Sequence, residues 1–273
     1  MSELDPAPAD ATTIARPFLS WAGSKRKLLD QITPHVPLSF DRYFEPFLGG
    51  GSLFLHLRPK EAFLNDACLP LVDTWRAVAK NPSGVYREAV KRPLEKDAYY
   101  LARAERGGGY LQRAGRFIYL NKGAFNGLYR VNLKGEFNVP WGASKNGFIC
   151  DRSNLNGVGE VLRASEAELT HGDFEQVLSR AGAGDFAFVD PPYVTSHNNN
   201  GFIAYNEKIF SWDDQQRLAK AVRAAVSRGR TSSSQTRTTC QSPTSIPSSN
   251  GSCWSEPPHW RPRRRSGGAP PRS

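Results

Sequence analysis

The segment FAFVDPPYVTS, residues 186–196, constrains the fold of this chain more than any other stretch. It is a short apolar run that ends in an acid and two prolines. Short apolar runs bounded by Gly or Pro are typical of strands buried on both faces of a parallel sheet. Proline fixes its own φ and restricts the preceding residue to extended conformations, so the carboxylate of Asp190 is held firmly. The segment therefore predicts an α/β fold with an acid at the carboxyl end of a central strand, where open α/β sheets place their sites.

Further strand and helix patterns support this fold class. RYFEPFLGG (42–50) and EAFLNDA (61–67) are similar apolar runs next to turn residues, which predicts two more buried strands. WDDQQRLAKAVRAAV (212–226) repeats apolar residues at helical spacing after Ser211, a predicted N-cap. GSKRKLLDQI (23–32) predicts the start of another helix.

The middle and the end of the chain differ from this alternating pattern. Gly-rich, aromatic and basic pieces between about residues 72 and 160 predict an inserted lobe. Residues 229–273 are rich in Ser, Pro, Thr and Arg without apolar periodicity, which indicates either a disordered basic tail or a shifted reading frame. The formal charge of +10 favours a polyanionic partner, but this tail, with seven Arg and one Glu, carries +6 of it. The body of the chain is therefore only moderately basic.

Composition argues against several other classes of protein. No run approaches the roughly 18 apolar residues of a membrane span, and residues 1–15 lack the basic and apolar regions of a signal peptide. The four cysteines stand far apart without a CxxC pair, so neither a zinc site nor a disulfide framework is indicated. We expect a cytoplasmic protein without a membrane or metal partner, and a disordered N-terminus over 1–15.

The residues DPPY (190–193) fit a grip on an amino group that undergoes methylation. The carboxylate of Asp190 and the carbonyl of Pro191 are two acceptors that can together hold an –NH2 group. Tyr193 adds a flat face on which a base can stack, worth about 1–3 kcal/mol. The amino nitrogen of a base is a poor nucleophile because its lone pair is delocalised, and two acceptors favour its pyramidal form in a transition state. An ordinary Asp-Pro turn is the alternative.

FEPFLGGGS (44–52) predicts a second part of a ligand site. Glycines after a strand let the backbone approach a ligand closely. The segment lacks the GK[ST] ending of a P-loop and a clean GxGxxG, so a phosphate-binding role has weak support, and a plain turn is equally compatible. Asp66, at the end of the next predicted strand, suits the two hydroxyls of a ribose, although a helix cap is the commoner role for such an Asp.

Five segments together resemble one known family. They are FLSWAGSKRKL (18–28), FEPFLGGGS (44–52), FNGLYRVNLKGEFNVPWG (125–142), HGDFEQVL (171–178) and FVDPPY (188–193). In this order they closely resemble the Dam-type, D12-class DNA adenine-N6 methyltransferases over about residues 16–226. The resemblance implies a Rossmann-like, S-adenosylmethionine-dependent methyltransferase sheet with an inserted, mainly helical DNA-recognition lobe. It implies a catalytic domain made of 16–71 and 161–228, and a recognition domain over 72–160.

The resemblance also implies roles residue by residue. The cofactor-binding positions are Trp21, Lys25, Glu45, Phe47, Gly49, Asp66, Asp173, Phe174 and Asp190. The catalytic motif is Asp190, Pro191, Pro192 and Tyr193. The DNA-contacting positions are Phe125, Asn126, Leu128, Arg130 and Asn132. Arg commonly reads guanine and Asn adenine, and an aromatic side chain can fill the gap that a flipped base leaves. An Arg and an Asn in an ordinary hairpin are the alternative for these positions.

The implied function is transfer of a methyl group from S-adenosylmethionine to N6 of a flipped adenine in double-stranded DNA. Ser20 and Ser144 stand where GATC-specific members of the family often have Lys and an aromatic residue, so GATC is one candidate target. We expect a monomer, and the resemblance allows a cognate restriction endonuclease as partner. Two alternatives remain: methylation of another amino group such as cytosine N4, and an inactive DNA- or cofactor-binding remnant, which the unusual tail favours.

Overall fold

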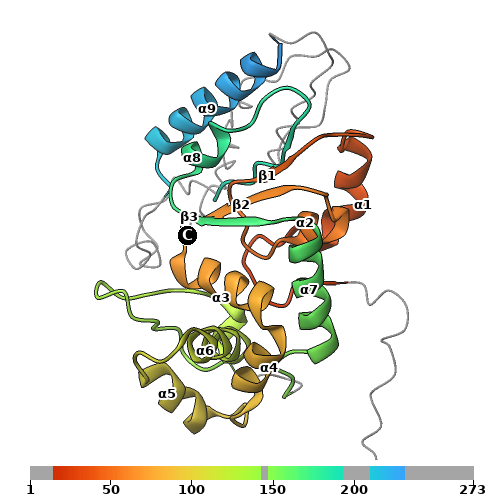
Figure 1. Cartoon of the computed structure of the whole chain (residues 1–273). Helices are drawn as coiled ribbons and strands as arrows, with labels where there is room; N and C mark the ends of the chain where they lie inside the picture. Colours follow the sequence, from red (N-terminus) through yellow and green to blue (C-terminus); the bar gives the residue numbers. More distant parts are fainter. Residues whose placement is uncertain (1–14, 143–146, 193–209, 231–273) are drawn as a thin grey trace, which may run out of the picture. The chain divides into compact units, whose positions relative to one another are not determined.

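The fold is built on a four-stranded parallel sheet (Figure 1), seen in a computed structural model that describes residues 15–142, 147–192 and 210–230. The strands are β1 (Tyr43–Glu45), β2 (Ala62–Asp66), β3 (Glu168–His171) and β4 (Phe186–Ala187). They lie in the order β3-β2-β1-β4, and every pairing is parallel. The α/β fold class is confirmed.

Side chains of the central strands alternate between two buried layers. Phe44 and Phe63 pack with the layer under α8 and α9, whereas Tyr43 and Leu64 belong to the larger core on the opposite face. Figure 1 shows α8 and α9 on one side of the sheet and α3 and α7 on the other. A strand that is buried on both faces has no need for polar residues, which explains the continuous apolar runs that predicted β1, β2 and β4.

β3 was not predicted as a strand. In this strand at the edge of the sheet, Glu168 and His171 are exposed, Leu169 and Thr170 are half-buried, and only Leu169 is aliphatic. It has no apolar run, and its pairing with β2 fixes its conformation instead.

The helices cover both faces of the sheet and form the lobe. In the part of the chain that the structure describes they are α1 (Leu29–Ile32), α2 (Ser52–Leu57), α3 (Leu69–Lys80), α4 (Pro82–Val90), α5 (Lys96–Ala104), α6 (Tyr110–Gly123), α7 (Arg152–Ala164), α8 (Phe174–Leu178) and α9 (Trp212–Arg230). Three 3-10 turns accompany them, η1 (Lys25–Leu28), η2 (Thr33–His35) and η3 (Phe125–Gly127). No helix of these described residues is long and apolar enough to cross a membrane.

Two helix predictions can be compared directly with the structure. The helix expected after Ser211 is α9, and Ser211 is its N-cap, because its Oγ accepts a hydrogen bond from Asp214 N at 3.1 Å. Leu218 and Ala225 of α9 are buried against the sheet layer, so Ala225 rather than Val226 continues the apolar face. The helix expected over 23–32 forms only as the 3-10 turn η1 followed by the four-residue α1.

The inserted lobe is mainly helical, as expected. In α6, Gly115 faces α4 so closely that a Cβ there would lie 2.4 Å from Glu88 Cβ and 2.7 Å from Ala89 N, and a glycine is therefore needed for this packing. After α6 the chain forms an extended hairpin closed by antiparallel bridges, Ala124–Trp141 and Val131–Phe137.

The domain division proposed from the sequence remains a prediction. Its boundary at 71/72 falls inside α3, and its boundary at 160/161 falls inside α7. Both helices run continuously through these points, because α7 packs on α3 and α4 along its length. The predicted N-terminal segment is described only from Ala15, and 231–273 of the predicted tail lie outside the described residues.

Candidate active site

The candidate site lies where the strand order of the sheet reverses. From β1 the chain proceeds to β2 and β3 on one side, and β4 is added on the other side of β1. Glu45 ends β1, and Asp190 follows β4, so both acids stand at the carboxyl ends of neighbouring parallel strands. Such a switch point is where open α/β sheets bind ligands.

The glycine loop after β1 (residues 46–51) is held by hydrogen bonds to its backbone. Gly49 N donates to Asp66 Oδ2 at 2.9 Å, and Gly49 O accepts from Trp75 Nε1 at 3.2 Å. Gly49 has a φ of +49°, and a Cβ there would lie 2.8 Å from Cδ1 of Trp21. The loop therefore requires glycine at this position for both its conformation and its contact with the indole.

Trp21 connects the glycine loop to the recognition lobe. Its ring stacks on Tyr129 with centroids 5.7 Å apart and lies 6.2 Å from Phe117 of α6. One edge of Trp21 meets Gly49 and its face meets Tyr129, so a single side chain contacts both the glycine loop and the hairpin.

Three carboxylates share this end of the sheet. Glu45 is 2% exposed and accepts a hydrogen bond from Tyr43 Oη at 2.8 Å. Burial raises the pKa of Glu45 to about 8, and the charges of Asp190 and Asp66 contribute in the same direction. Burial also raises the pKa of Asp66, although the N–H groups of Gly49 and Cys68 oppose this by donating to its two oxygens. The negative charges of Asp190 and Asp66 thus add to the effect of burial in favouring the protonated form of Glu45.

One cation partly compensates this charge. Lys25 Nζ forms an ion pair and a hydrogen bond with Asp190 Oδ2, and it donates a second hydrogen bond to Gly23 O at 2.9 Å. The two side chains are only 11% and 18% exposed, so the pair is shielded from bulk water. Lys25 therefore fixes the direction of the Asp190 carboxylate.

The DPPY motif is described in part. Pro191 is half-buried and Pro192 is exposed directly after Asp190. The predicted stacking residue Tyr193 lies outside the described residues, as does Ser144.

Asp173 and Phe174 follow β3 at the start of α8, and Phe174 contacts the glycine loop. Asp173 caps α8 by accepting from Glu175 N at 2.9 Å and pairs with Arg217 at 2.7 Å. Phe174 is buried, with its ring 5.5 Å from Phe47 of the loop and 5.9 Å from Phe210. The structure thus brings Phe47 and Phe174 together beside the crevice.

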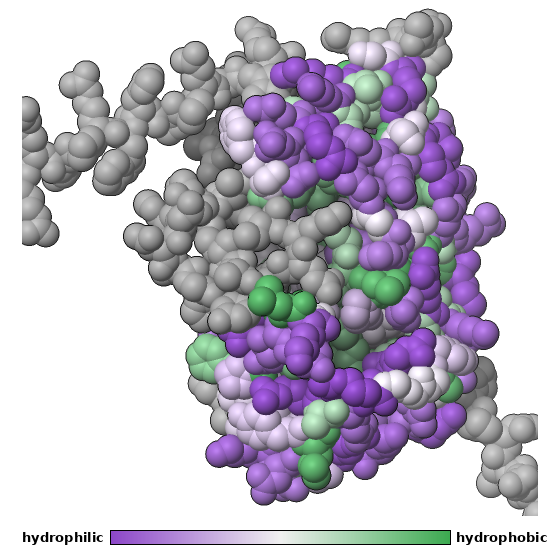
Figure 2. All heavy atoms as spheres, turned by 90° about the vertical axis from the view of Figure 1, so that its left-hand side faces the viewer, coloured by the Kyte–Doolittle hydropathy of each residue, from purple (hydrophilic) through white to green (hydrophobic). Residues whose placement is uncertain are grey.

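The predicted DNA-contacting residues lie on the lobe. Phe125 is 50% exposed, and Asn126 adopts the left-handed conformation, with φ of +52°. Arg130 donates to Asn138 Oδ1 at 2.7 Å, and Asn132 Nδ2 donates to Glu136 Oε2 at 3.0 Å, so both also stabilise the hairpin. Leu128 is half-buried beside them. Figure 2 views the side on which the hairpin projects in Figure 1, and this face is largely hydrophilic with hydrophobic residues in small groups.

A hollow of about 290 Å³ separates these residues from the glycine loop. Its lining includes Ser20, Trp21, Lys122 and Asn126. Burial lowers the pKa of Lys122. The hollow is therefore lined both by the segment around Trp21 and by Asn126 at the start of the hairpin.

Several supporting residues were not identified from the sequence. Buried Asn65 donates from Nδ2 to the carbonyls of Pro46 and Gly172, each at 3.1 Å, and so joins the β1 and β3 ends. Tyr43 and Trp75 hold Glu45 and Gly49, as described above. Of these residues, only Asn65 could have been identified from the sequence, because it is a polar residue that interrupts the apolar run of β2 just before Asp66. Within the described residues no group of His, Cys, Asp and Glu is arranged to hold a metal ion.

Comparisons with known proteins agree with this geometry. A model of the D12 class N6 adenine-specific DNA methyltransferase family matches residues 21–246. The chain is 36% identical over 222 residues to type II methyltransferase M1.LlaDCHI from Lactococcus lactis subsp. cremoris, with 78% of each chain covered. It is 35% identical over 237 residues to type II methyltransferase M.MjaIII from Methanocaldococcus jannaschii, with 78% of this chain and 81% of that one covered.

A third relative carries a different name. The DNA adenine methylase of Serratia marcescens is 35% identical over 212 residues, with 75% of this chain and 76% of the relative covered. The family model covers most of the chain, and its match contains the acids at the ends of β1, β2 and β4. The chain belongs to the D12 class of N6 adenine-specific DNA methyltransferases.

Proposed function

We propose that this protein transfers a methyl group from S-adenosylmethionine to N6 of an adenine that is flipped out of double-stranded DNA. The observation that carries the proposal is the Lys25–Asp190 ion pair at the end of β4, next to buried Glu45 at the end of β1. Pro191 directly follows the acid, so a carboxylate and a carbonyl stand together as acceptors for an amino group.

The charges of the crevice fit this methyl donor. S-adenosylmethionine carries a sulfonium and an ammonium group, has a ribose with two hydroxyls, and has no phosphate. Glu45 and Asp66 would accept from the ammonium group and the ribose, and the backbone of the glycine loop can approach the ligand closely. Phe47 and Phe174 supply an apolar surface for the adenine ring. When bound, the donor supplies an electrophilic methyl group, which N6 of the target adenine accepts in an in-line displacement.

Asp190 prepares the target nitrogen for attack. Lys25 contacts Oδ2 of Asp190, which leaves Oδ1 to accept an N–H of the adenine amino group. An acceptor on each N–H withdraws the nitrogen lone pair from the ring and stabilises the positive charge that develops during transfer. Lys25 holds the carboxylate in a fixed direction, and the shielding of the pair from water strengthens the attraction between the two groups.

The relatives support the proposed substrate, whereas the candidate target sequence comes from the resemblance to the family. Relatives at 35% and 36% identity are named DNA adenine methylase and type II methyltransferase, which supports adenine in DNA and allows a partner endonuclease. GATC is the sequence to test first. Ser20 contributes only a short side chain to the hollow beside Asn126, so recognition of the outer bases would differ from that of members with Lys there.

Transfer of a tritiated methyl group to unmethylated duplex DNA tests the proposal. The full chain should label duplex DNA, and sequencing of the product should place every methyl group on N6 of adenine within one short sequence. Asp190→Ala should reduce transfer at least about a hundredfold and leave binding of S-adenosylmethionine within a few-fold. Asp213→Ala, which removes an exposed carboxylate on α9, is the matched control.

Each other outcome has a definite meaning. Methyl groups on cytosine N4 would replace the adenine assignment with the main alternative. A folded chain that binds duplex DNA but transfers nothing would instead establish a binding remnant. Unchanged transfer by Asp190→Ala would remove Asp190 from the mechanism.

A further inference from the structure

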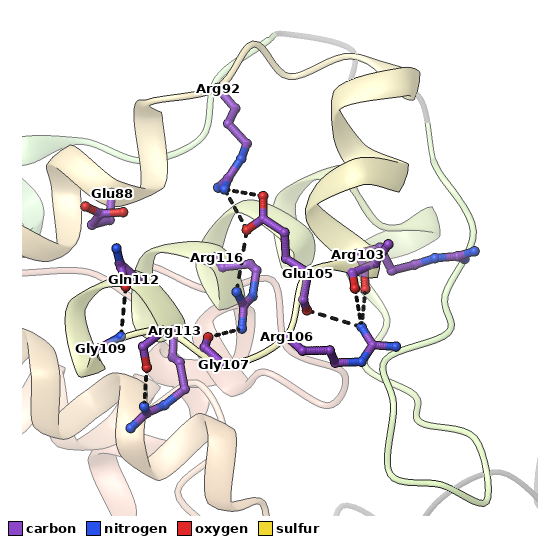
Figure 3. Close-up of polar contacts among 12 residues, drawn as sticks. Glu88, Arg92, Arg103, Glu105, Arg106, Gly107, Gly109, Gln112, Arg113 and Arg116 are labelled. Carbon is purple, nitrogen blue, oxygen red and sulfur yellow. Dashed lines mark hydrogen bonds and ion pairs between the residues drawn. The ribbon is translucent and has the colours of Figure 1, made fainter.

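A second charged cluster lies in the lobe, outside the candidate active site. We name it the Arg92 cluster, and its members are Lys91, Arg92, Glu105, Arg106 and Arg116. They line a hollow of about 230 Å³. Figure 3 shows Arg92, from the segment after α4, and Arg116, from α6, directed toward Glu105 in the segment after α5, where Arg106 is the next residue.

The central contacts of the cluster are unbalanced in charge. Arg92 Nη2 donates to both oxygens of Glu105, at 2.6 and 2.7 Å. Arg116 Nη1 lies 3.5 Å from Glu105 Oε2, and its Nη2 donates to Gly107 O at 2.9 Å. Two guanidinium groups therefore share one carboxylate. Arginine does not lose its proton in proteins, so one positive charge lacks a carboxylate within this group.

Burial makes this imbalance significant. The side chains of Arg92 and Arg116 are only 20% and 16% exposed, whereas Glu105 is 41% exposed. Shielded charges interact more strongly with a counterion than exposed ones, because water screens them less. Arg92 uses only Nη2 in its contacts with Glu105, which leaves Nε and Nη1 for a further acceptor.

The neighbouring charged groups do not supply the missing anion. Lys91 pairs with Glu88, and Arg106 pairs with Glu136 at 2.8 Å, so each of these carboxylates already has its own cation. A further arginine, Arg113, donates to Gly108 O at 2.6 Å. Among the described residues around the hollow, cations therefore exceed carboxylates.

The cluster is connected to the part of the lobe that is predicted to read bases. Glu136 accepts from Arg106 through Oε1 and from Asn132 through Oε2, at 2.8 and 3.0 Å. Asn132 is one of the residues proposed to contact DNA. Arg106 of the cluster and Asn132 of the hairpin thus share one carboxylate, which connects the cluster to the hairpin.

We propose that the Arg92 cluster binds a backbone phosphate of duplex DNA next to the recognised sequence. Phosphate oxygens accept hydrogen bonds from guanidinium N–H groups, and a phosphate would compensate the charge that Glu105 leaves unmatched. Phosphate contacts position a protein on DNA without reading its sequence. The proposal rests on the proposed function, because it takes duplex DNA as the substrate.

Salt-dependent binding of a fluorescent duplex to the full chain tests this proposal. Arg92→Gln should reduce the slope of log Kd against log salt by about one, and should weaken binding about five- to tenfold at 0.1 M salt, because one phosphate contact is lost. The loss should be equal for a target duplex and a scrambled duplex, whereas loss of a base contact affects only the target. Arg180→Gln is the matched control, since it also removes an Arg paired with an exposed Glu, in the sheet domain.

Glu105→Gln gives a test with the opposite sign. Removing the competing carboxylate should tighten binding of both duplexes by a similar factor. If the ion pairs only stabilise the lobe, Glu105→Gln will not bind DNA more tightly. Thermal unfolding of each variant shows whether the substitution has instead lowered the stability of the lobe. Unchanged or weaker binding by Glu105→Gln, or an unchanged slope for Arg92→Gln, would overturn the proposal while methyl transfer by the wild type persists. A wild-type chain that binds no duplex would instead overturn the proposed function as well.

Discussion

Replacing Glu45 with Gln should remove a pH-dependent loss of stability. Burial raises the pKa of Glu45 in the folded protein from its ordinary value of 4.5 to about 8. Between these two values the folded state holds a proton that the unfolded state has released. The free energy of unfolding must therefore fall as the pH rises through this window, by at most about 1.4 kcal/mol per pH unit. The loss is absent below pH 4.5 and complete above pH 8.

Urea unfolding of wild type and Glu45→Gln at about pH 5.5, 6.5 and 7.5 measures this effect. Other titrating groups are common to both proteins, so the difference between their unfolding free energies isolates Glu45. As the pH rises, the unfolding free energy of the variant should increase relative to that of the wild type by about 1 kcal/mol or more per pH unit. Gln retains the shape of the side chain and an oxygen that can accept the hydrogen bond from Tyr43. Glu160→Gln, at an exposed position of α7, controls for the loss of one carboxylate.

The ionisation of Glu45 should also make the affinity for the methyl donor depend on pH. A cationic ligand favours ionised Glu45, so the wild-type affinity should rise with pH by up to about tenfold per unit and level off above pH 8. Calorimetry in buffers of different ionisation enthalpy should show release of up to about one proton near pH 7. If the stabilities of wild type and Glu45→Gln remain parallel from pH 5.5 to 7.5, the reasoning about this buried acid is wrong.

Three further substitutions test the remaining supports of the site. Lys25→Met leaves the shielded carboxylate of Asp190 without its cation, so methyl transfer should fall at least about tenfold; a variant that keeps wild-type rates would exclude this role. Gly49→Ala forces a side chain into a left-handed position against Trp21 and should lower the unfolding free energy by about 1–3 kcal/mol in urea; no loss would show that the loop can relax. Asn65→Ala leaves two buried carbonyls without their donor and should cost about 2–3 kcal/mol, which the same urea experiment measures; a cost below about 0.5 kcal/mol would mean that water replaces the amide.

Local sequence patterns predicted the strands that are buried on both faces and the helix that has a regular apolar face. β1, β2 and β4 were found because both of their faces are covered, and α9 was found because Ser211 caps it before a regular apolar face. β3 was missed because its pairing with β2, and not its own composition, makes it a strand. The two domain boundaries were placed where composition changes, but helices such as α7 extend across that change.

The site could be predicted less completely than the fold. The acids at strand ends were visible in the sequence, and the resemblance to the family supplied their roles. The contact between Lys25 and Asp190 joins residues 165 positions apart, and it depends on β4 lying beside β1, which no local pattern encodes. Asp66 is not the N-cap of α3, because Cys68 holds that position. The carboxylate of Asp66 instead accepts hydrogen bonds from the N–H groups of Gly49 and Cys68, and the ribose contact remains a proposal.

The charges of the crevice and of the lobe have opposite signs, and the two ligands require this division. A cationic methyl donor needs carboxylates, but the same carboxylates would repel the DNA that must approach them. Two features reduce this conflict: Glu45 holds its proton through most of the neutral range, and Lys25 neutralises Asp190. In our proposal the attraction for phosphates comes instead from the excess of arginine around Arg92, which lies outside the candidate active site. Additional negative charge in the crevice would therefore favour the methyl donor but repel DNA, and additional positive charge would have the opposite effect.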